Sequence, residues 1–416
     1  MVSFLEEELM DYNVLKKKIP EKLSNNIIFQ TAGVKPSGKV IIGFGLAGKI
    51  DKQVAGFFHD RILLITDNNI VSLKIHQIVI NSLKEKDCQV TLFSEVEPEP
   101  KLEMARKVQE MVRKKEYSLV IGLGGGSVMD MAKTASIMAT NDGDIEDYMT
   151  GTPIVKEGLP NVLIPTTSGT GSEVSPFIVL SKEDKKLFIG SPYIYATIAL
   201  VDPLLTVSMP EKVTAATGLD TLSHGVEGLI ANTNPFTEAL SYQCIKYVFR
   251  YLEKACRNGL DLEARYYMSC ASVLGMMSYA QGGGLYAHSL SYILTLRNGV
   301  PHGVGCGLAL PYTLLFNFDY IKPVLLKMAR YILQEDISNI SDEERAFKAI
   351  EGFYQLLLKV KVPARLQDLA IERSEINVFA SELVNKYYRD KNPRELTEHE
   401  ARELLEMMWE GSLKRI

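Results

Sequence analysis

Residues 118–138 read SLVIGLGGGSVMDMAKTASIM, an apolar run followed by three glycines and a helical pattern. Continuous apolar runs are typical of strands buried inside parallel sheets, and a helix usually carries the chain back across such a sheet. At the turn, Gly124, Gly125, Gly126 and Ser127 would let backbone N–H groups approach a phosphate at the start of the helix. The stretch therefore predicts a strand–turn–helix unit of an α/β fold, although a plain tight turn explains the glycines equally well.

The same alternation of apolar runs and helical patterns extends in both directions from this unit. The other runs are KVIIGF (39–44), RILLITD (61–67), QVTLFS (89–94), NVLIPTTSG (161–169) and ATIALVD (196–202). After residue 202 the strand signals stop, and helical patterns follow to the end of the chain. We therefore expect an α/β nucleotide-binding domain over residues 1–206 and an all-α domain over residues 207–416.

The boundary between the two expected domains carries a helix-start signal. Ser208, Pro210 and Glu211 mark this boundary, and the Ser-x-x-Glu spacing fits a capping box, so a helix is expected to open there. Ligands of open α/β sheets bind beyond the carboxyl ends of the strands. The cleft between the two halves is therefore the expected active site.

Composition limits the partners and the compartment. A length of 416 residues suits two domains, and a net charge of −5 without long basic runs indicates no nucleic-acid partner. No uninterrupted apolar stretch reaches the roughly 18 to 20 residues that span a bilayer, so no membrane partner is expected. The acidic start MVSFLEEELMDY is unlike a signal peptide, and five cysteines without metal-type spacing suggest reduced thiols. A cytoplasmic enzyme is the expectation.

A second glycine motif competes for the phosphate. Gly43-x-Gly45-x-x-Gly48 follows an apolar run and ends 19 residues before Asp67, which matches the spacing of a dinucleotide fingerprint. A third segment, PTTSGTGS (165–172), offers several hydroxyls at another strand end, suited to phosphate or nicotinamide contacts. The spacing alone leaves the choice open, but several such strand ends in one sheet favour a nucleotide.

Metal ligands are the second chemical signal. In GLDTLSHGVEGLI (218–230), Asp220 and His224 are four residues apart, so they share one face of a helix and can chelate one ion. His288 lies in an apolar helical run, and His302 lies in a turn before another helix. One carboxylate and three imidazoles suit divalent iron or zinc with a position left open for substrate. Buried core histidines are the alternative. Glu227, three residues after His224, could be an alternative ligand, a solvated surface acid or a residue that hydrogen-bonds to a ligand, and we favour the last of these.

Four motifs in one order, IGLGGGSVMDMAK, IPTTSGTGSEV, ATGLDTLSHGVEG and VPHG, resemble the iron-containing (group III) alcohol dehydrogenase family. The resemblance implies a dehydroquinate synthase-like fold, with an α/β nucleotide-binding domain and a helical metal-binding and substrate domain. It also favours the turn at residues 124–127 over the Gly43 motif for the pyrophosphate. By the same resemblance, the metal ligands are Asp220, His224, His288 and His302.

The resemblance further implies the cofactor contacts and the reaction. Asp67 would meet the ribose hydroxyls of NAD, and other contacts would come from Thr166, Thr167, Thr170 and Lys186, Thr167 being included as part of the hydroxyl-rich segment. The implied reaction is hydride transfer between NAD(H) and a small primary alcohol or aldehyde, with Fe²⁺, or alternatively Zn²⁺, at the metal centre. A homodimer is typical of the family.

One position departs from the family pattern. Many members carry another histidine four residues after the third ligand, where this chain has Tyr292. We therefore take His288 and Tyr292 as the candidate catalytic pair, with the tyrosine hydroxyl substituting in part for that histidine. Several alternatives remain open: a zinc-dependent polyol dehydrogenase, a phosphonoacetaldehyde reductase-like enzyme suggested by HSLSY-x-LT, and a non-catalytic metal- or nucleotide-binding relative. A dehydroquinate synthase-like lyase is a further alternative. Such a lyase would need a cluster of Lys and Arg to hold a charged sugar phosphate, and the motif-bearing segments supply only Lys133, Lys186 and Arg297.

Overall fold

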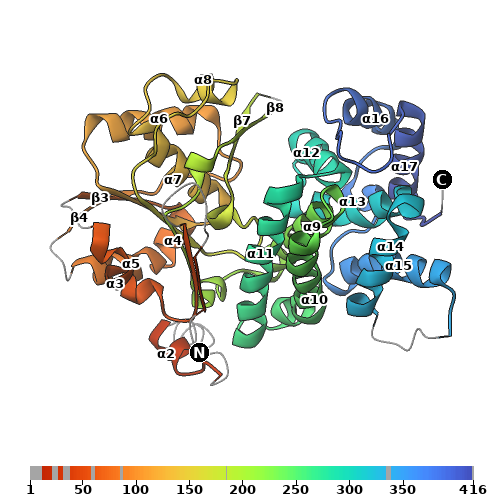
Figure 1. Ribbon diagram of the computed structural model, residues 1–416, viewed down its shortest axis with the longest axis horizontal. Helices are drawn as coiled ribbons and strands as arrows, with labels where there is room; N and C mark the ends of the chain where they lie inside the picture. Colours follow the sequence, from red (N-terminus) through yellow and green to blue (C-terminus); the bar gives the residue numbers. More distant parts are fainter. Residues whose placement is uncertain are drawn as a thin grey trace. The chain divides into compact units, whose positions relative to one another are not determined.

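The computed structural model describes residues 12–20, 27–30, 38–57, 61–84, 88–183, 185–333 and 339–414. The chain divides into two compact units, Met1–Met209 and Pro210–Ile416. The first is an α/β unit and the second is helical, so the predicted fold class is confirmed (Figure 1).

A seven-stranded sheet with the order β1-β2-β9-β6-β5-β3-β4 forms the centre of the first unit. All neighbouring strands are parallel except the β1–β2 pair. The strands are β1 (Ile27–Gln30), β2 (Lys39–Ile42), β3 (Arg61–Ile65), β4 (Gln89–Phe93), β5 (Leu119–Gly124), β6 (Asn161–Pro165) and β9 (Ile198–Val201). Each of the six apolar runs picked out in the sequence forms a parallel strand.

The connections of this sheet mark one place for a ligand. The chain leaves β3 toward β4 at one edge, whereas it leaves β5 in the opposite direction toward β6. Open α/β sheets bind ligands where the connections diverge in this way, beyond the carboxyl ends of the two strands. The ends of β3 and β5 carry Asp67 and the Gly124 turn.

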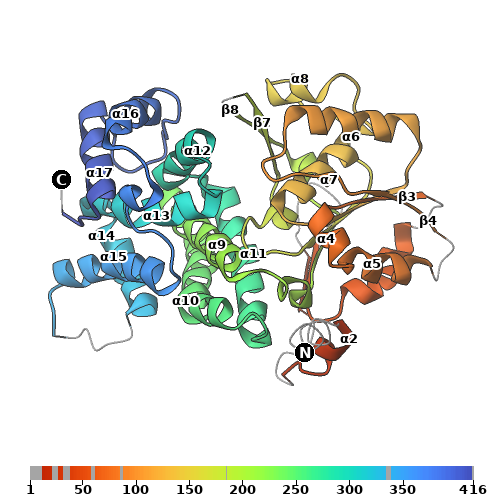
Figure 2. The same ribbon diagram turned by 180° about the vertical axis from the view of Figure 1, so that it is seen from behind.

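Two separate apolar cores lie on the two faces of the sheet, because successive side chains of a strand point to opposite faces. Leu63 and Ile65 of β3 pack with α6 and α7, whereas Ile62 and Leu64 pack with α3 and α5. Figures 1 and 2 show helices covering both faces. The helices are α2 (Tyr12–Lys16), α3 (Ile50–Val54), α4 (Asn68–Ser72), α5 (Ile75–Lys84), α6 (Leu102–Lys114), α7 (Gly126–Met138) and α8 (Ile145–Met149).

A hairpin that the sequence analysis did not predict joins this unit. Strands β7 (Phe177–Lys182) and β8 (Lys185–Gly190) pair antiparallel to each other, outside the main sheet. Short 3-10 helices complete the connections of the chain: η2 (Ala47–Lys49), η3 (Ala55–Phe57), η4 (Ser172–Val174), η5 (Pro192–Ile194), η6 (Pro203–Thr206), η7 (Leu366–Leu369) and η8 (Arg373–Glu375).

The second unit consists of helices around one apolar core. They are α9 (Glu211–Ala231), α10 (Pro235–Arg257), α11 (Leu262–Gly282), α12 (Tyr286–Asn298), α13 (His302–Phe316), α14 (Phe318–Ile332), α15 (Asp342–Lys359), α16 (Ile376–Asn385) and α17 (Glu398–Glu410). Glycines let α9 approach its neighbours closely. A Cβ on Gly303 of α13 would lie 2.0 Å from the Ala216 carbonyl oxygen, and one on Gly228 would lie 2.5 Å from the Tyr279 nitrogen. These contacts bring the backbones of α13 and α11 against α9.

The predicted capping box at Ser208 is wrong. Helix α9 begins at Glu211, with Pro210 in the cap position and no side-chain cap bond. A capping box on Ser208 would require Met209 to be helical, but a residue that precedes proline is disfavoured in that conformation. The helix therefore starts after the proline.

Among the described residues, none of the helices combines the length and the apolar character that crossing a bilayer requires.

Candidate active site

Three helices of the second unit bring the four predicted metal ligands together. Asp220 and His224 lie one turn apart on α9, His288 lies in the first turn of α12, and His302 is the first residue of α13. The close approach of Gly303 to α9 carries His302 to Asp220, because an added Cβ at Gly303 would also lie 3.1 Å from the Asp220 Cβ.

The imidazoles surround one carboxylate oxygen. Asp220 Oδ1 lies 3.8 Å from His224 Nε2, 3.8 Å from His288 Nε2 and 3.6 Å from His302 Nε2. Asp220 Oδ1 and His288 Nε2 are buried and lack a hydrogen-bond partner among the described residues. Two ligands about 2.1 Å from a tetrahedral ion lie roughly 3.4 Å apart, so the spacing and the unsatisfied atoms fit a divalent cation.

Glu227 supports the cluster from α9, in the manner expected from the sequence. Its Oε2 lies 2.5 Å from His288 Nδ1 and accepts the Leu285 N–H at 2.9 Å, while its Oε1 accepts the Ala287 N–H at 2.8 Å. One carboxylate thus orients the His288 ring and satisfies the uncapped start of α12. Burial opposes its charge, but His288 and the backbone donors hold the pKa of Glu227 below its usual range.

His302 is oriented by a hydroxyl and covered by a ring. Ser291 Oγ lies 2.8 Å from His302 Nδ1 and donates to the His302 carbonyl oxygen at 2.7 Å. The Tyr292 ring stacks on the His302 ring, with centroids 5.4 Å apart. Burial raises the pKa of Tyr292, so its hydroxyl keeps its proton at neutral pH. The candidate catalytic tyrosine therefore lies beside the cluster.

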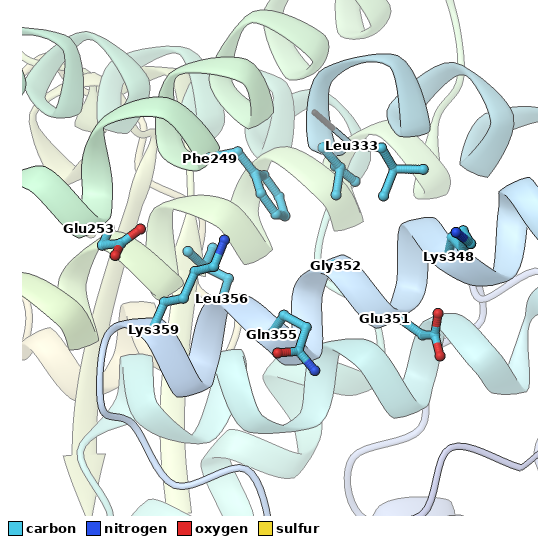
Figure 3. A pocket seen from close by; sticks show the side chains of 10 residues that line it. Phe249, Glu253, Leu333, Lys348, Glu351, Gly352, Gln355, Leu356 and Lys359 are labelled. Carbon is cyan, nitrogen blue, oxygen red and sulfur yellow. The ribbon is translucent and has the colours of Figure 1, made fainter. Parts of the chain in front are cut away.

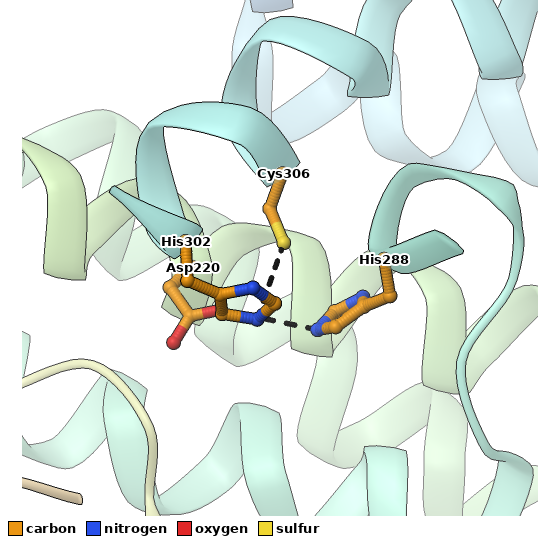
Figure 4. Close-up of side chains that lie close together, drawn as sticks. All are labelled: Asp220, His288, His302 and Cys306. Carbon is orange, nitrogen blue, oxygen red and sulfur yellow. Dashed lines mark hydrogen bonds and ion pairs between the residues drawn. The ribbon is translucent and has the colours of Figure 1, made fainter. Parts of the chain in front are cut away.

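Two residues near the cluster were not identified from the sequence. The Arg389 guanidinium lies 5.8 Å from the Tyr292 ring centroid, and its Nε donates to Ser289 Oγ at 2.8 Å. The Cys306 Sγ lies 3.6 Å from His302 Nε2 (Figure 4). Arg389 is distant from every motif in the sequence. Cys306, however, stands four residues after His302 on the same helix, and that spacing could have identified it.

The glycine turn of the first unit leaves a helix start open. Helix α7 begins at Gly126, and no side chain caps it. A Cβ on Gly126 would lie 2.7 Å from Thr170 Cγ2, and one on Gly125 would lie 3.7 Å from Thr167 Oγ1. Thr166 joins the same turn through its N–H, which donates to the Gly124 carbonyl oxygen at 3.0 Å. The hydroxyl-rich segment therefore packs over the glycines beside the first N–H groups of α7, which a helix leaves without a partner of its own and which suit a phosphate.

Asp67 lies next to this turn, at the end of β3. Its Oδ1 accepts the N–H groups of Asn69 and Ile70, at 2.8 and 3.0 Å, and so caps α4. Both contacts use Oδ1, so among the described residues Oδ2 remains available for a ribose hydroxyl. Thr66 ties the two strand ends together by donating to the Leu123 carbonyl oxygen at 2.7 Å.

Lys186 lies on β8 of the hairpin. Its ammonium pairs with Glu99 and donates to Ser181 Oγ at 2.9 Å. Burial lowers the pKa of Lys186 to about 8. The structure thus places this predicted cofactor contact against its own hairpin and Glu99.

A buried ionic network anchors the hydroxyl-rich segment. Lys133 of α7 is fully buried and donates to Ser172 Oγ at 2.7 Å and to Ser175 Oγ at 2.9 Å. Asp130 accepts from Ser172 Oγ at 2.6 Å, and burial raises the pKa of the neighbouring Glu173 to about 7. These contacts hold residues 165–172 on α7, beside the glycine turn.

The backbone N–H groups of the competing Gly43 motif already have hydrogen-bond partners within the chain. Asp202, at the end of β9, accepts the N–H of Gly45 through Oδ1 and the N–H of Ala47 through Oδ2, both at 3.0 Å. The N–H of Gly48 donates to the Tyr12 hydroxyl at 3.3 Å, and that hydroxyl donates to Asp202. An internal carboxylate therefore occupies the amides that a phosphate would need.

A surface pocket of about 470 Å³ lies elsewhere in the second unit (Figure 3). Its lining comes mainly from α10 and α15 and carries both charges: Phe249, Glu253, Ile332, Leu333, Lys348, Glu351, Gly352, Gln355, Leu356 and Lys359. None of the predicted site residues lines it, so we do not assign it to the reaction.

Comparison with known proteins matches both units to the same protein family. The family profile described as "Iron-containing alcohol dehydrogenase" matches residues 36–203. The profile described as "Fe-containing alcohol dehydrogenase family, C-terminal" matches residues 214–409. Long-chain-alcohol dehydrogenase 1 of Geobacillus thermodenitrificans is 34% identical over 380 residues, covering 89% of this chain and 95% of the relative. Choline dehydrogenase of Bacillus subtilis is 32% identical over 362 residues, covering 86% and 90%.

Solved structures agree with these matches. A 1,3-propanediol oxidoreductase superposes with a TM-score of 0.85 at 29% identity, covering 89% of this chain and 97% of that one. An alcohol dehydrogenase from Oenococcus oeni superposes with a TM-score of 0.84 at 26% identity, covering 92% and 100%.

Proposed function

Because the chain belongs to the iron-containing alcohol dehydrogenase family, we propose that it transfers a hydride between NAD(H) and a small primary alcohol or the corresponding aldehyde. Divalent iron, with zinc as the alternative, would be held by Asp220, His224, His288 and His302. The observation that carries this proposal is the ring of three imidazole nitrogens, each 3.6 to 3.8 Å from Asp220 Oδ1.

A bound cation would supply a Lewis acid that stabilises negative charge on the substrate oxygen. The chain's own residues prepare its place. Glu227 fixes the tautomer of His288 so that Nε2 carries the lone pair, and Ser291 orients the ring of His302. The stacked Tyr292 ring shields one side of His302 from water, and its protonated hydroxyl is available as a hydrogen-bond donor.

NAD⁺ would supply the hydride acceptor. Three features of the first unit support its binding: the open start of α7, the hydroxyls of Thr166, Thr167 and Thr170, and the free oxygen of Asp67. A carboxylate at the ribose favours NAD over NADP, because it would repel a 2′-phosphate. We include Lys186 among the contacts on family resemblance; its pairing with Glu99 means that it would have to leave that partner.

The substrate class rests on the relatives. Their names include long-chain alcohols, choline, 1,3-propanediol and 4-hydroxybutyrate, which share a hydroxyl group and little else. We therefore propose the interconversion of an alcohol and its aldehyde. A screen of short, long and charged alcohols with NAD⁺ would identify the rest of the substrate.

We also propose a cytoplasmic homodimer. Phe236 of α10 and Tyr320 of α14 are 80% and 62% exposed, and a second copy of the chain could cover such apolar side chains. Light scattering after gel filtration measures the number of subunits directly.

Replacing His288 by alanine tests the proposed metal centre. We expect bound metal and alcohol oxidation to fall together to background, because the variant loses both a ligand and the partner of Glu227. NADH binding, measured by fluorescence, should be retained, since its proposed contacts lie in the other unit.

His399→Ala is the matched control, because His399 is 80% exposed on α17 and should change none of these readouts. Full activity in a metal-free His288→Ala protein would refute the assignment.

A further inference from the structure

Cys306 lies among the four candidate metal ligands but is not one of them. It is fully buried on α13, one turn after His302. Its Sγ and one ligand atom each of Asp220, His288 and His302 all lie within 4.8 Å of one another. Figure 4 shows the Cys306 side chain pointing toward the His302 ring, on the side where the ligand atoms gather.

Unsatisfied atoms in the same cluster point independently to a ligand. Asp220 is 3% exposed and His288 is 1% exposed, yet Asp220 Oδ1 and His288 Nε2 have no hydrogen-bond partner among the described residues. Leaving such buried atoms unpaired costs about 1–3 kcal/mol each. A cation at this point would satisfy both atoms, and Cys306 Sγ lies in the same group.

We propose that Cys306 adds a thiolate ligand to the cation that Asp220, His224, His288 and His302 would hold. The proposal rests on the proposed metal centre and extends it. A bond forms between Sγ and the cation while the S–H bond breaks, and the proton leaves to solvent; no oxidant or reductant takes part. A ring of oxygen and nitrogen ligands thereby becomes a mixed set that includes sulfur.

The chemistry of sulfur gives this difference a consequence for the metal. Thiolate is a soft ligand that favours zinc and cobalt over hard cations such as magnesium and manganese. In the region that the structure describes, Cys244, Cys256 and Cys270 are also buried, but no ligand group of the kind formed at Cys306 includes them. Replacing Cys306 by serine should therefore weaken zinc binding more than replacing any other buried cysteine of this unit.

Substitution of cobalt into the full-length enzyme tests directly whether sulfur is bonded to the metal. A thiolate bound to Co²⁺ produces an intense near-ultraviolet charge-transfer band, which oxygen and nitrogen ligands do not produce. We expect this band in the wild-type protein, its loss in Cys306→Ser, and its retention in Cys270→Ser, the matched control. Elemental analysis of each sample reports the cobalt bound.

The outcomes separate this proposal from the proposed function. Stoichiometric cobalt without a thiolate band in the wild-type protein overturns the role of Cys306 and leaves the metal centre intact. Failure of the wild-type protein to bind cobalt, zinc or iron overturns both. A band that persists in Cys306→Ser assigns the sulfur to another cysteine and also overturns the proposal.

X-ray absorption of the zinc-loaded wild-type enzyme needs no variant and covers the case in which Cys306→Ser fails to fold. Zinc–sulfur bonds measure about 2.3 Å, whereas bonds to nitrogen and oxygen measure about 2.0–2.2 Å. One sulfur scatterer at the longer distance is the expected result. A first shell of nitrogen and oxygen alone would rule out the thiolate.

Discussion

At the scale of single residues, the site depends on side chains that each perform two tasks. Glu227 is the clearest case, because it contacts the His288 ring and also accepts the Leu285 and Ala287 N–H groups at the start of α12. Ser291 does the same for His302, touching its ring nitrogen and its carbonyl oxygen. A ligand that is fixed through both its ring and its backbone loses little entropy when a cation binds.

Glu227→Gln should weaken metal binding without removing a ligand. The amide is neutral and can present only one acceptor oxygen, so His288 loses its charged partner or α12 loses a cap bond. Changes at such supporting residues reduce metal affinity by roughly 10–100-fold. Competition with a chromophoric chelator measures this affinity, and Glu410→Gln, at an exposed position of α17, is the control. An unchanged affinity would mean that the contact with His288 has no energetic role.

At the scale of elements, the strands were predictable and the exceptions have physical reasons. Runs such as RILLITD are apolar because a parallel strand is buried on both faces, as β3 is in two separate cores. The hairpin β7–β8 was missed because it lies outside the main sheet and its second strand opens with two lysines and is partly exposed, so it lacks the continuous apolar run of a buried parallel strand. The capping box failed because the Ser-x-x-Glu pattern takes no account of the intervening Pro210.

The start of α7 offers a test of the proposed cofactor turn. In Gly126→Ala, the new methyl group would meet Thr170 Cγ2 at 2.7 Å and Thr170 Oγ1 at 2.9 Å, so the threonine or the helix start has to move. Overpacking of this kind costs about 1–3 kcal/mol. If that cost falls on the cofactor-binding geometry, NADH affinity should drop by roughly tenfold or more.

Titration calorimetry with NADH measures the change. Gly56→Ala serves as the control, because a Cβ at Gly56 meets nothing within 4 Å. Equal affinities in the two variants would place the pyrophosphate somewhere other than this turn.

At the scale of the whole molecule, the proposed cofactor contacts and the proposed metal ligands fall in different compact units. The sequence showed part of each set through residues closely spaced along the chain, a glycine turn in one case and Asp220 with His224 on one helix face in the other, and the family resemblance completed both sets. Arg389 could not be predicted in the same way, since only the packing of the helical unit brings it to Tyr292. Spacing in sequence identifies local chemistry, whereas neighbours from distant helices require the fold.

This division predicts that the two ligands protect different parts of the chain. A ligand at 100 times its dissociation constant stabilises the folded state by about 2.7 kcal/mol. In hydrogen exchange of the metal-free enzyme, adding Zn²⁺ should slow exchange most in α9, α12 and α13. Adding NAD⁺ should slow it most from β5 into α7.

Mg²⁺ is the control for the metal arm of this experiment, because it prefers an all-oxygen octahedral shell and should protect the three helices little. Zinc protection confined to the α/β unit would contradict the proposed location of the cation.

The carboxylate of Asp202 has a consequence for the search for nucleotide-binding proteins by sequence motif. In the Gly43 loop, the side chain of Asp202 accepts amide N–H groups of the kind that face a diphosphate in a dinucleotide-binding turn, so the spacing of the fingerprint is present while its amides already have a partner. A short glycine pattern thus reports the path of the backbone and not what fills it. A motif search would reject more false matches of this kind if it also tested whether an aspartate or glutamate stands at the end of a neighbouring strand.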